Sequence, residues 1–153
     1  MSHRKLVIDG FDTDADTLSQ QLHHLSTTTA TEQLHQVEQK ASQVRAFITR
    51  GNTNEALNKA LSDPPYGHGM EGAQAANAQL VSEILMSTRA QDINQVVAAL
   101  GEEARDVLLK YIYHGLKRPA EFNCGVLLSW HEKVVEAGGL GSIVRVLSDR
   151  KTV

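Results

Sequence analysis

The last third of the chain, residues 104–153, contains three closely spaced runs of apolar residues, and Gly or Pro follows the first two. In the first two runs the apolar residues recur mainly every three or four positions, the spacing that places side chains on one face of an α-helix. These positions are Ala104, Val107, Leu108, Tyr111 and Ile112 in the first run, and Leu127, Trp130, Val134 and Ala137 in the second. Because such helices depend on packing of the apolar face, the stretch predicts helices packed on one another, on upstream helices or on another protein.

The third run differs because no single helical face contains all of its apolar residues. These residues are Ile143, Val144, Val146 and Leu147. A helix that is apolar on several sides is buried on several sides, and a small domain offers few places to bury one. We therefore expect this terminal helix to lie between its own domain and a partner, with Arg150, Lys151 and Val153 just beyond it also at the interface.

Trp130, the only tryptophan of the chain, lies on the apolar face of the second run. We interpret it as a core residue, together with Tyr111 and Leu127. An interface hot spot is the alternative role for a single tryptophan.

The composition indicates one helical domain. The chain has 153 residues, of which 41% are hydrophobic and only 5% aromatic, with Gly and Pro confined to a few breaks. A chain of this length buries roughly 70% of its unfolded surface as a single domain. Frequent Ala, Leu, Gln and Glu favour helix over strand.

Charge and cysteine content exclude several classes of function. With a net charge of −3, nothing in the sequence suggests the basic stripe that nucleic-acid binding requires. The single cysteine, Cys124, excludes an intrachain disulfide and indicates a reducing compartment. No segment reaches the roughly 20 apolar residues of a membrane span, and no signal peptide is recognised. We expect a cytosolic protein.

Helix start and stop signals divide the middle of the chain. Thr31 is the predicted start of a first helix that ends at Gly51, and Asn52 is the predicted N-cap of a second, with Glu55 as its capping-box partner. Asp63-Pro64-Pro65 ends the second helix. Further helices are predicted over residues 73–88, from Gln91 or Asp92 to residue 100, and over residues 102–115.

One internal similarity indicates how these helices pack. RGNTNEALNKAL and RAQDINQVVAAL align without gaps and begin at Arg50 and Arg89, a spacing of about 39 residues that is typical of helical-pair repeats. The predicted fold is all-α, with six or seven helices stacked as antiparallel pairs in a solenoid-like arrangement over residues 31–153. An extended or disordered N-terminal tail, residues 1–30, precedes this scaffold domain.

The predicted tail combines a short apolar anchor with acidic and polar residues. It has no sustained helical period, which is typical of a segment without a packed core. It is interpreted either as a flexible terminus or as a peptide that orders on a partner, with Val7, Ile8 and Phe11 in pockets.

Catalytic and metal-binding motifs are incomplete. His131-Glu132 begins HEKVV, but the second histidine of a zinc-peptidase helix is replaced by Val135. Gly138-Gly139-Leu140-Gly141 follows a helix rather than a strand, so a tight helix–helix turn is favoured over a phosphate loop. The aspartates near residue 9 lack the glycine and glutamate of a calcium loop. We therefore expect no enzyme, no cofactor and no metal.

Several strings in the chain resemble the smallest, 16-kDa subunit of the actin-related protein 2/3 complex. They are LLKYIYHGL from Leu108, LLSWHEKVVEAGGLGSIVRVL from Leu127 and the terminal SDRKTV. The resemblance continues more weakly through RGNTNEALNKALSDPP from Arg50 and LVIDGFD from Leu6, so it covers most of the chain.

This resemblance implies a structural subunit of a seven-membered complex that nucleates branched actin filaments. The helical body would dock on the propeller subunit and a 20-kDa subunit, and the tail would tether actin-related protein 2. ATP would bind to the actin-related subunits, and actin would be contacted indirectly in the cytoplasmic actin cytoskeleton. The alternatives are a free-standing helical-repeat adaptor that binds peptides and a small hydrolase or metalloprotein, which the motifs favour least.

Overall fold

The computed structural model describes residues 12–66 and 69–153, with side chains from Thr31 onward, and this part of the chain is all-α, as predicted. Its helices are α1 (Asp12–Thr49), α2 (Thr53–Leu61), α3 (Glu71–Ser87), α4 (Ile93–Ala99), α5 (Glu102–Leu116) and α6 (Cys124–Ser148). None of the helices in these residues is both long and apolar enough to span a membrane.

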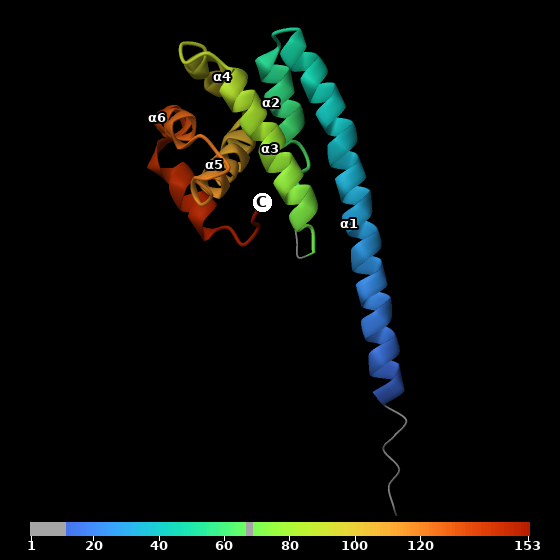
Figure 1. Cartoon of the computed structure of the whole chain (residues 1–153). Helices are drawn as coiled ribbons and strands as arrows, with labels where there is room; N and C mark the ends of the chain where they lie inside the picture. The colour runs from blue at the N-terminus through green and yellow to red at the C-terminus, as the bar shows by residue number, and fades with distance from the viewer. Residues whose placement is uncertain (1–11, 67–68) are drawn as a thin grey trace, which may run out of the picture.

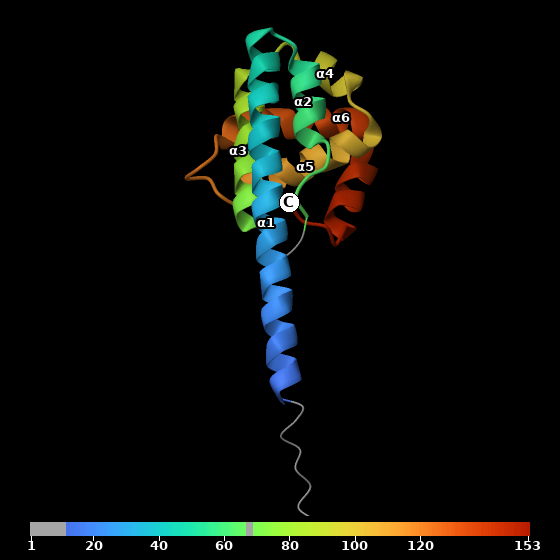
Figure 2. The same ribbon diagram turned by 90° about the vertical axis from the view of Figure 1, so that its right-hand side faces the viewer.

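The helices form two packed groups (Figure 1). α1 and α2 form an antiparallel pair, and α3 returns alongside both. α5 and α6 pack closely on each other and cover the other side of α3, with α4 at one end. The C-terminal half of α1 lies on this body, whereas its N-terminal half projects well beyond it in both views (Figures 1 and 2).

The start of α1 corrects one prediction. The sequence predicts a first helix from Thr31 after an extended tail, but α1 begins at Asp12. Nucleating a helix costs free energy, because several residues must be ordered to form the first hydrogen bond. Lengthening an existing helix costs less, because each added residue brings one further hydrogen bond. A polar sequence such as residues 12–30 can therefore continue a helix that is anchored elsewhere. Val37 and Val44, both buried against the body, provide that anchor.

The turn between α1 and α2 also differs in detail from the prediction. Gly51 adopts the left-handed conformation with φ of 77°, and Asn52 occupies the N-cap position of α2. The Asn52 side chain makes no capping bond to the helix backbone. Instead, its Nδ2 donates to Oε2 of Glu55 at 3.3 Å, while its backbone N–H donates to Phe47 O at 3.0 Å.

The three predicted core residues, Trp130, Tyr111 and Leu127, are all buried. Trp130 is fully enclosed, and its Nε1 donates to the Leu85 carbonyl at 3.3 Å, joining α6 to α3. Asn77 of α3 is equally buried and donates both to the Ala60 carbonyl and to the Tyr111 hydroxyl. Burial raises the pKa of Tyr111, so this hydroxyl stays neutral. These bonds connect α2, α3 and α5 across the core.

Gly139 divides α6 into two helical parts. Its φ of 68° and ψ of 177° fall in a region that is essentially restricted to glycine. The chain therefore changes direction at the place where the sequence predicts a tight turn. Residues 140–148, called here the terminal segment of α6, run from this turn along α5.

Candidate protein-interaction surface

The terminal segment of α6 presents an apolar stripe to solvent. Leu140, Val144 and Leu147 are 75%, 65% and 70% exposed. Their spacing of four and three residues places them on one side of the helix. These three residues are called here the terminal apolar face. Several large exposed apolar residues on one helical face are typical of an interaction site rather than of a free surface.

The opposite side of the terminal segment is fixed to α5. Val146 is buried in the core. Arg145 forms a bidentate salt bridge with Asp106, in which Nε donates to Oδ2 at 2.7 Å and Nη2 donates to Oδ1 at 3.0 Å. Nη2 of Arg145 also lies 3.0 Å from Oε1 of Glu102. A paired arginine–carboxylate contact restricts orientation as well as distance. The terminal apolar face is therefore held in one orientation on a rigid support.

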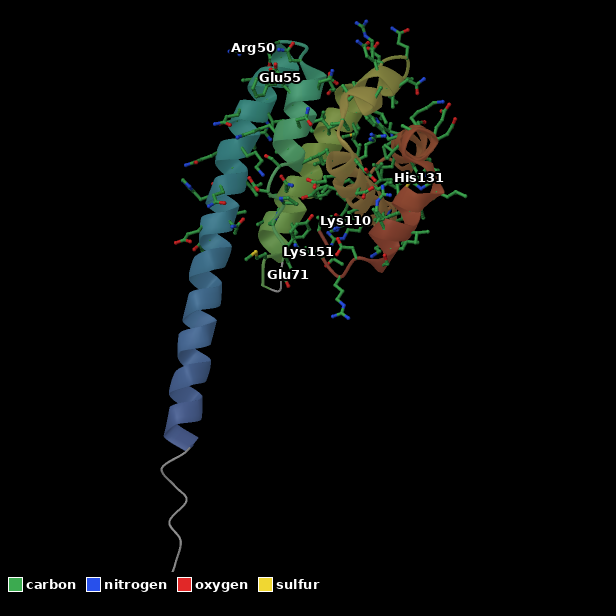
Figure 3. The ribbon with its side chains drawn as sticks, turned by 180° about the vertical axis from the view of Figure 1, so that it is seen from behind. Arg50, Glu55, Glu71, Lys110, His131 and Lys151 are labelled. Atoms are coloured by element: carbon green, nitrogen blue, oxygen red, sulfur yellow. The ribbon has the colours of Figure 1, made fainter. Side chains whose placement is uncertain are left out.

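The last five residues fold back against α5. Lys110 and Asp149 form an ion pair at 2.5 Å, and the Val153 carbonyl accepts from Nδ1 of His114 at 2.7 Å. Nζ of Lys110 and Nζ of Lys151 lie 5.1 and 5.7 Å from the centre of the Tyr66 ring. Lys110 and Lys151 lie close together in Figure 3. These contacts hold residues 149–153 on the body.

The predicted interface residues therefore separate into two groups. Val146 and Val153 are largely buried in the chain's own core, because Val146 faces α5 and Val153 is enclosed as residues 149–153 fold back. Val144, Leu147, Arg150 and Lys151 are exposed, and Ile143 is half-buried. The predicted anchor of Val7, Ile8 and Phe11 lies outside the described residues. Leu140 is added to the surface, although the sequence places it in a glycine-rich turn.

The Lys110–Asp149 pair predicts an acid-sensitive C-terminal segment. The hydrogen bond from Lys110 lowers the pKa of Asp149 below its ordinary value. In the unfolded chain an aspartate has a pKa of about 3.9, and above that pH the lowered pKa of Asp149 stabilises the folded segment. This stabilisation is lost as the pH falls through the pKa that Asp149 has in the folded chain. The protection of the residue 149–153 amides against hydrogen exchange, after correction for the intrinsic pH dependence of exchange, is expected to fall on acidification below about pH 4. Asp149→Asn should remove this acid-dependent loss of protection; the same loss of protection in that variant would contradict this assignment.

Among the described residues, His131 and Cys124 are each bonded to a neighbouring group that completes no catalytic set. Nε2 of His131 lies 3.1 Å from the Tyr113 hydroxyl, and Cys124 donates weakly to the Phe122 carbonyl. Within residues 12–66 and 69–153, no group of three or more His, Cys, Asp or Glu side chains is arranged to hold a metal ion. The terminal apolar face is therefore the strongest candidate site, and its chemistry is that of protein binding.

Comparison with known proteins points to one family. The family model described as "ARP2/3 complex 16 kDa subunit (p16-Arc)" matches residues 2–153. Actin-related protein 2/3 complex subunit 5-C of Xenopus laevis is 40% identical over 111 residues, which cover 72% of this chain and 74% of the relative. The subunit 5-like protein of Homo sapiens is 38% identical over 112 residues, covering 73% of each chain. Subunit 5 of Dictyostelium discoideum is 34% identical over 117 residues, covering 76% and 83%.

Proposed function

Because the chain belongs to the P16-Arc family of ARP2/3 complex subunits, we propose that it is a non-catalytic structural subunit of that complex. The complex nucleates branched actin filaments, so the chain would act in the cytoplasmic actin cytoskeleton. Its relatives bear the name of subunit 5 in animals and in Dictyostelium, which supports the same role here.

The observation that carries this proposal is the terminal apolar face. Leu140, Val144 and Leu147 are largely exposed, yet they are held rigidly by the contacts of Arg145 and Val146 with α5. Covering apolar surface stabilises a complex by roughly 25 cal/mol per Å² before the costs of association. A preformed apolar face is therefore well suited to permanent docking on neighbouring subunits, and we assign it to the contact with the propeller subunit or the 20-kDa subunit.

The projecting half of α1 supports a second role. The helical residues 12–30 project beyond the body (Figure 2). We propose that residues 1–30, including Val7, Ile8 and Phe11, tether actin-related protein 2, with ATP bound by the actin-related subunits and no cofactor bound by this chain. A tether raises the effective concentration of a mobile partner to roughly the millimolar range.

Deleting residues 1–30 is expected to leave the body in the complex while weakening nucleation, because the docking face and the tether lie at opposite ends of the chain. Pull-down of the other subunits measures docking, and a pyrene-actin assay measures nucleation. Full nucleation activity without residues 1–30 would contradict the tether, and loss of the other subunits from the pull-down would contradict docking through the body.

A further inference from the structure

A groove of about 440 Å³ lies beside the terminal apolar face, between the C-terminal half of α5 and residues 146–153. Its apolar lining comes from both sides, and Leu147 belongs to the groove as well as to the terminal apolar face. The apolar lining residues are Tyr113, Leu116, Val146, Leu147 and Val153. The groove is therefore continuous with the surface that we assign to subunit docking.

The charged side chains around the groove are predominantly basic. Lys110, Lys117 and Lys151 line it, and the only carboxylate side chain in the lining, Asp149, is paired with Lys110. Lys117 is exposed, and its ammonium has no partner among the described residues. The ammonium of Lys151 lies over the Tyr66 ring but forms no ion pair within the same residues.

This local charge is opposite in sign to that of the whole chain. With His114 neutral, the side chains that line the groove carry a charge of +2, whereas the chain carries −3. Complementary charge at an interface selects the partner and its register, and like charges in contact oppose binding. Two unpaired lysines beside an apolar floor therefore favour carboxylates attached to an apolar side chain.

We propose that this groove receives an acidic segment of a partner subunit. One large apolar side chain of that segment occupies the floor, and its carboxylates pair with Lys117 and Lys151. The inference rests on the proposed function, because it specifies the chemistry of the partner segment that docks beside the terminal apolar face. It adds that the partner's contact at this end of the molecule is acidic as well as apolar.

Charge reversal tests the proposal in the full chain. Lys117→Glu combined with Lys151→Glu is expected to weaken binding to a complex that lacks only this subunit by about tenfold or more, because carboxylates then face carboxylates. Lys59→Glu combined with Arg89→Glu is the matched control, since both residues are exposed, lie outside the groove on α2 and in the turn between α3 and α4, and undergo the same change in charge. The control is expected to bind within about twofold of the unmodified chain. Equal effects of the two double variants would overturn the proposal.

Photocrosslinking identifies the occupant directly. With p-benzoylphenylalanine in place of Lys117, the crosslinked peptide from the assembled complex is expected to carry net negative charge and a Leu, Ile, Met, Phe or Trp residue. A basic peptide, or no crosslink from a chain that has entered the complex, would overturn the groove assignment alone. Failure of the unmodified chain to enter the complex would overturn the proposed function and this inference together.

Discussion

Replacing Val144 and Leu147 together by aspartate is expected to detach the chain from its complex without unfolding it. Both side chains are mostly exposed in the isolated chain, at 65% and 70%, so their replacement should change the free energy of unfolding by no more than about 1 kcal/mol in total. In the assembled complex the two carboxylates would be buried without partners, which costs several kcal/mol. Binding is therefore expected to weaken at least about 100-fold, as measured by quantitative pull-down alongside thermal unfolding.

A matched control separates the terminal apolar face from apolar exposure in general. Met86 and Leu128 are each 55% exposed, and neither belongs to this face. Replacing both by aspartate adds the same charge as the Val144/Leu147 variant, at apolar side chains that are exposed to a comparable degree. Subunit binding should then stay within a few-fold of that of the unmodified chain. Normal binding by the Val144/Leu147 variant would contradict the assignment of this face to docking.

Trp130→Ala is expected to destabilise the body by about 3–5 kcal/mol. The side chain is completely enclosed, and the substitution also leaves the Leu85 carbonyl without its hydrogen bond from Nε1. A loss of this size is a large part of the roughly 5–15 kcal/mol that stabilises a typical domain. Denaturant unfolding followed by circular dichroism measures the change.

Leu128→Ala provides the comparison for Trp130, because it shortens an exposed apolar side chain of the same helix. It should move the unfolding midpoint only slightly. Similar midpoints for Trp130→Ala and the unmodified chain would contradict the role of Trp130 as the connection between α6 and α3.

Local signals in the sequence predict most of the fold. The spacing of apolar residues in α5 and α6 identifies the faces that contain Tyr111, Leu127 and Trp130. The glycines after the second run predict the change of direction at Gly139. These features depend on residues close together in the chain, so periodicity and turn chemistry are sufficient to find them.

The orientation of the terminal segment could not be predicted in this way. Its apolar residues lie on more than one side, and the sequence does not identify the side that contacts α5. That choice depends on contacts between distant parts of the chain: Val146 packs in the core, and the ion pairs of Arg145 with Asp106 and of Lys110 with Asp149 join residues 39 positions apart. In the folded chain Val146 lies inward and Leu140 lies outward, a difference that the local pattern does not reveal.

The length of α1 was missed for a different reason. Residues 12–30 are rich in polar side chains and carry no signal that predicts a packed helix on the body. Their helical conformation continues from the part of α1 that Val37 and Val44 anchor. Helix propagation from a packed nucleus depends on distant contacts, which residue-by-residue propensity does not contain.

The native mass of the endogenous protein tests the central claim most directly. If the terminal apolar face is permanently covered by other subunits, the chain should be found entirely in an assembly many times its own 16.7 kDa, with the other ARP2/3 subunits in equal amounts. A free-standing peptide-binding adaptor would instead be stable on its own. A monodisperse, folded monomer in cell extracts would contradict the account.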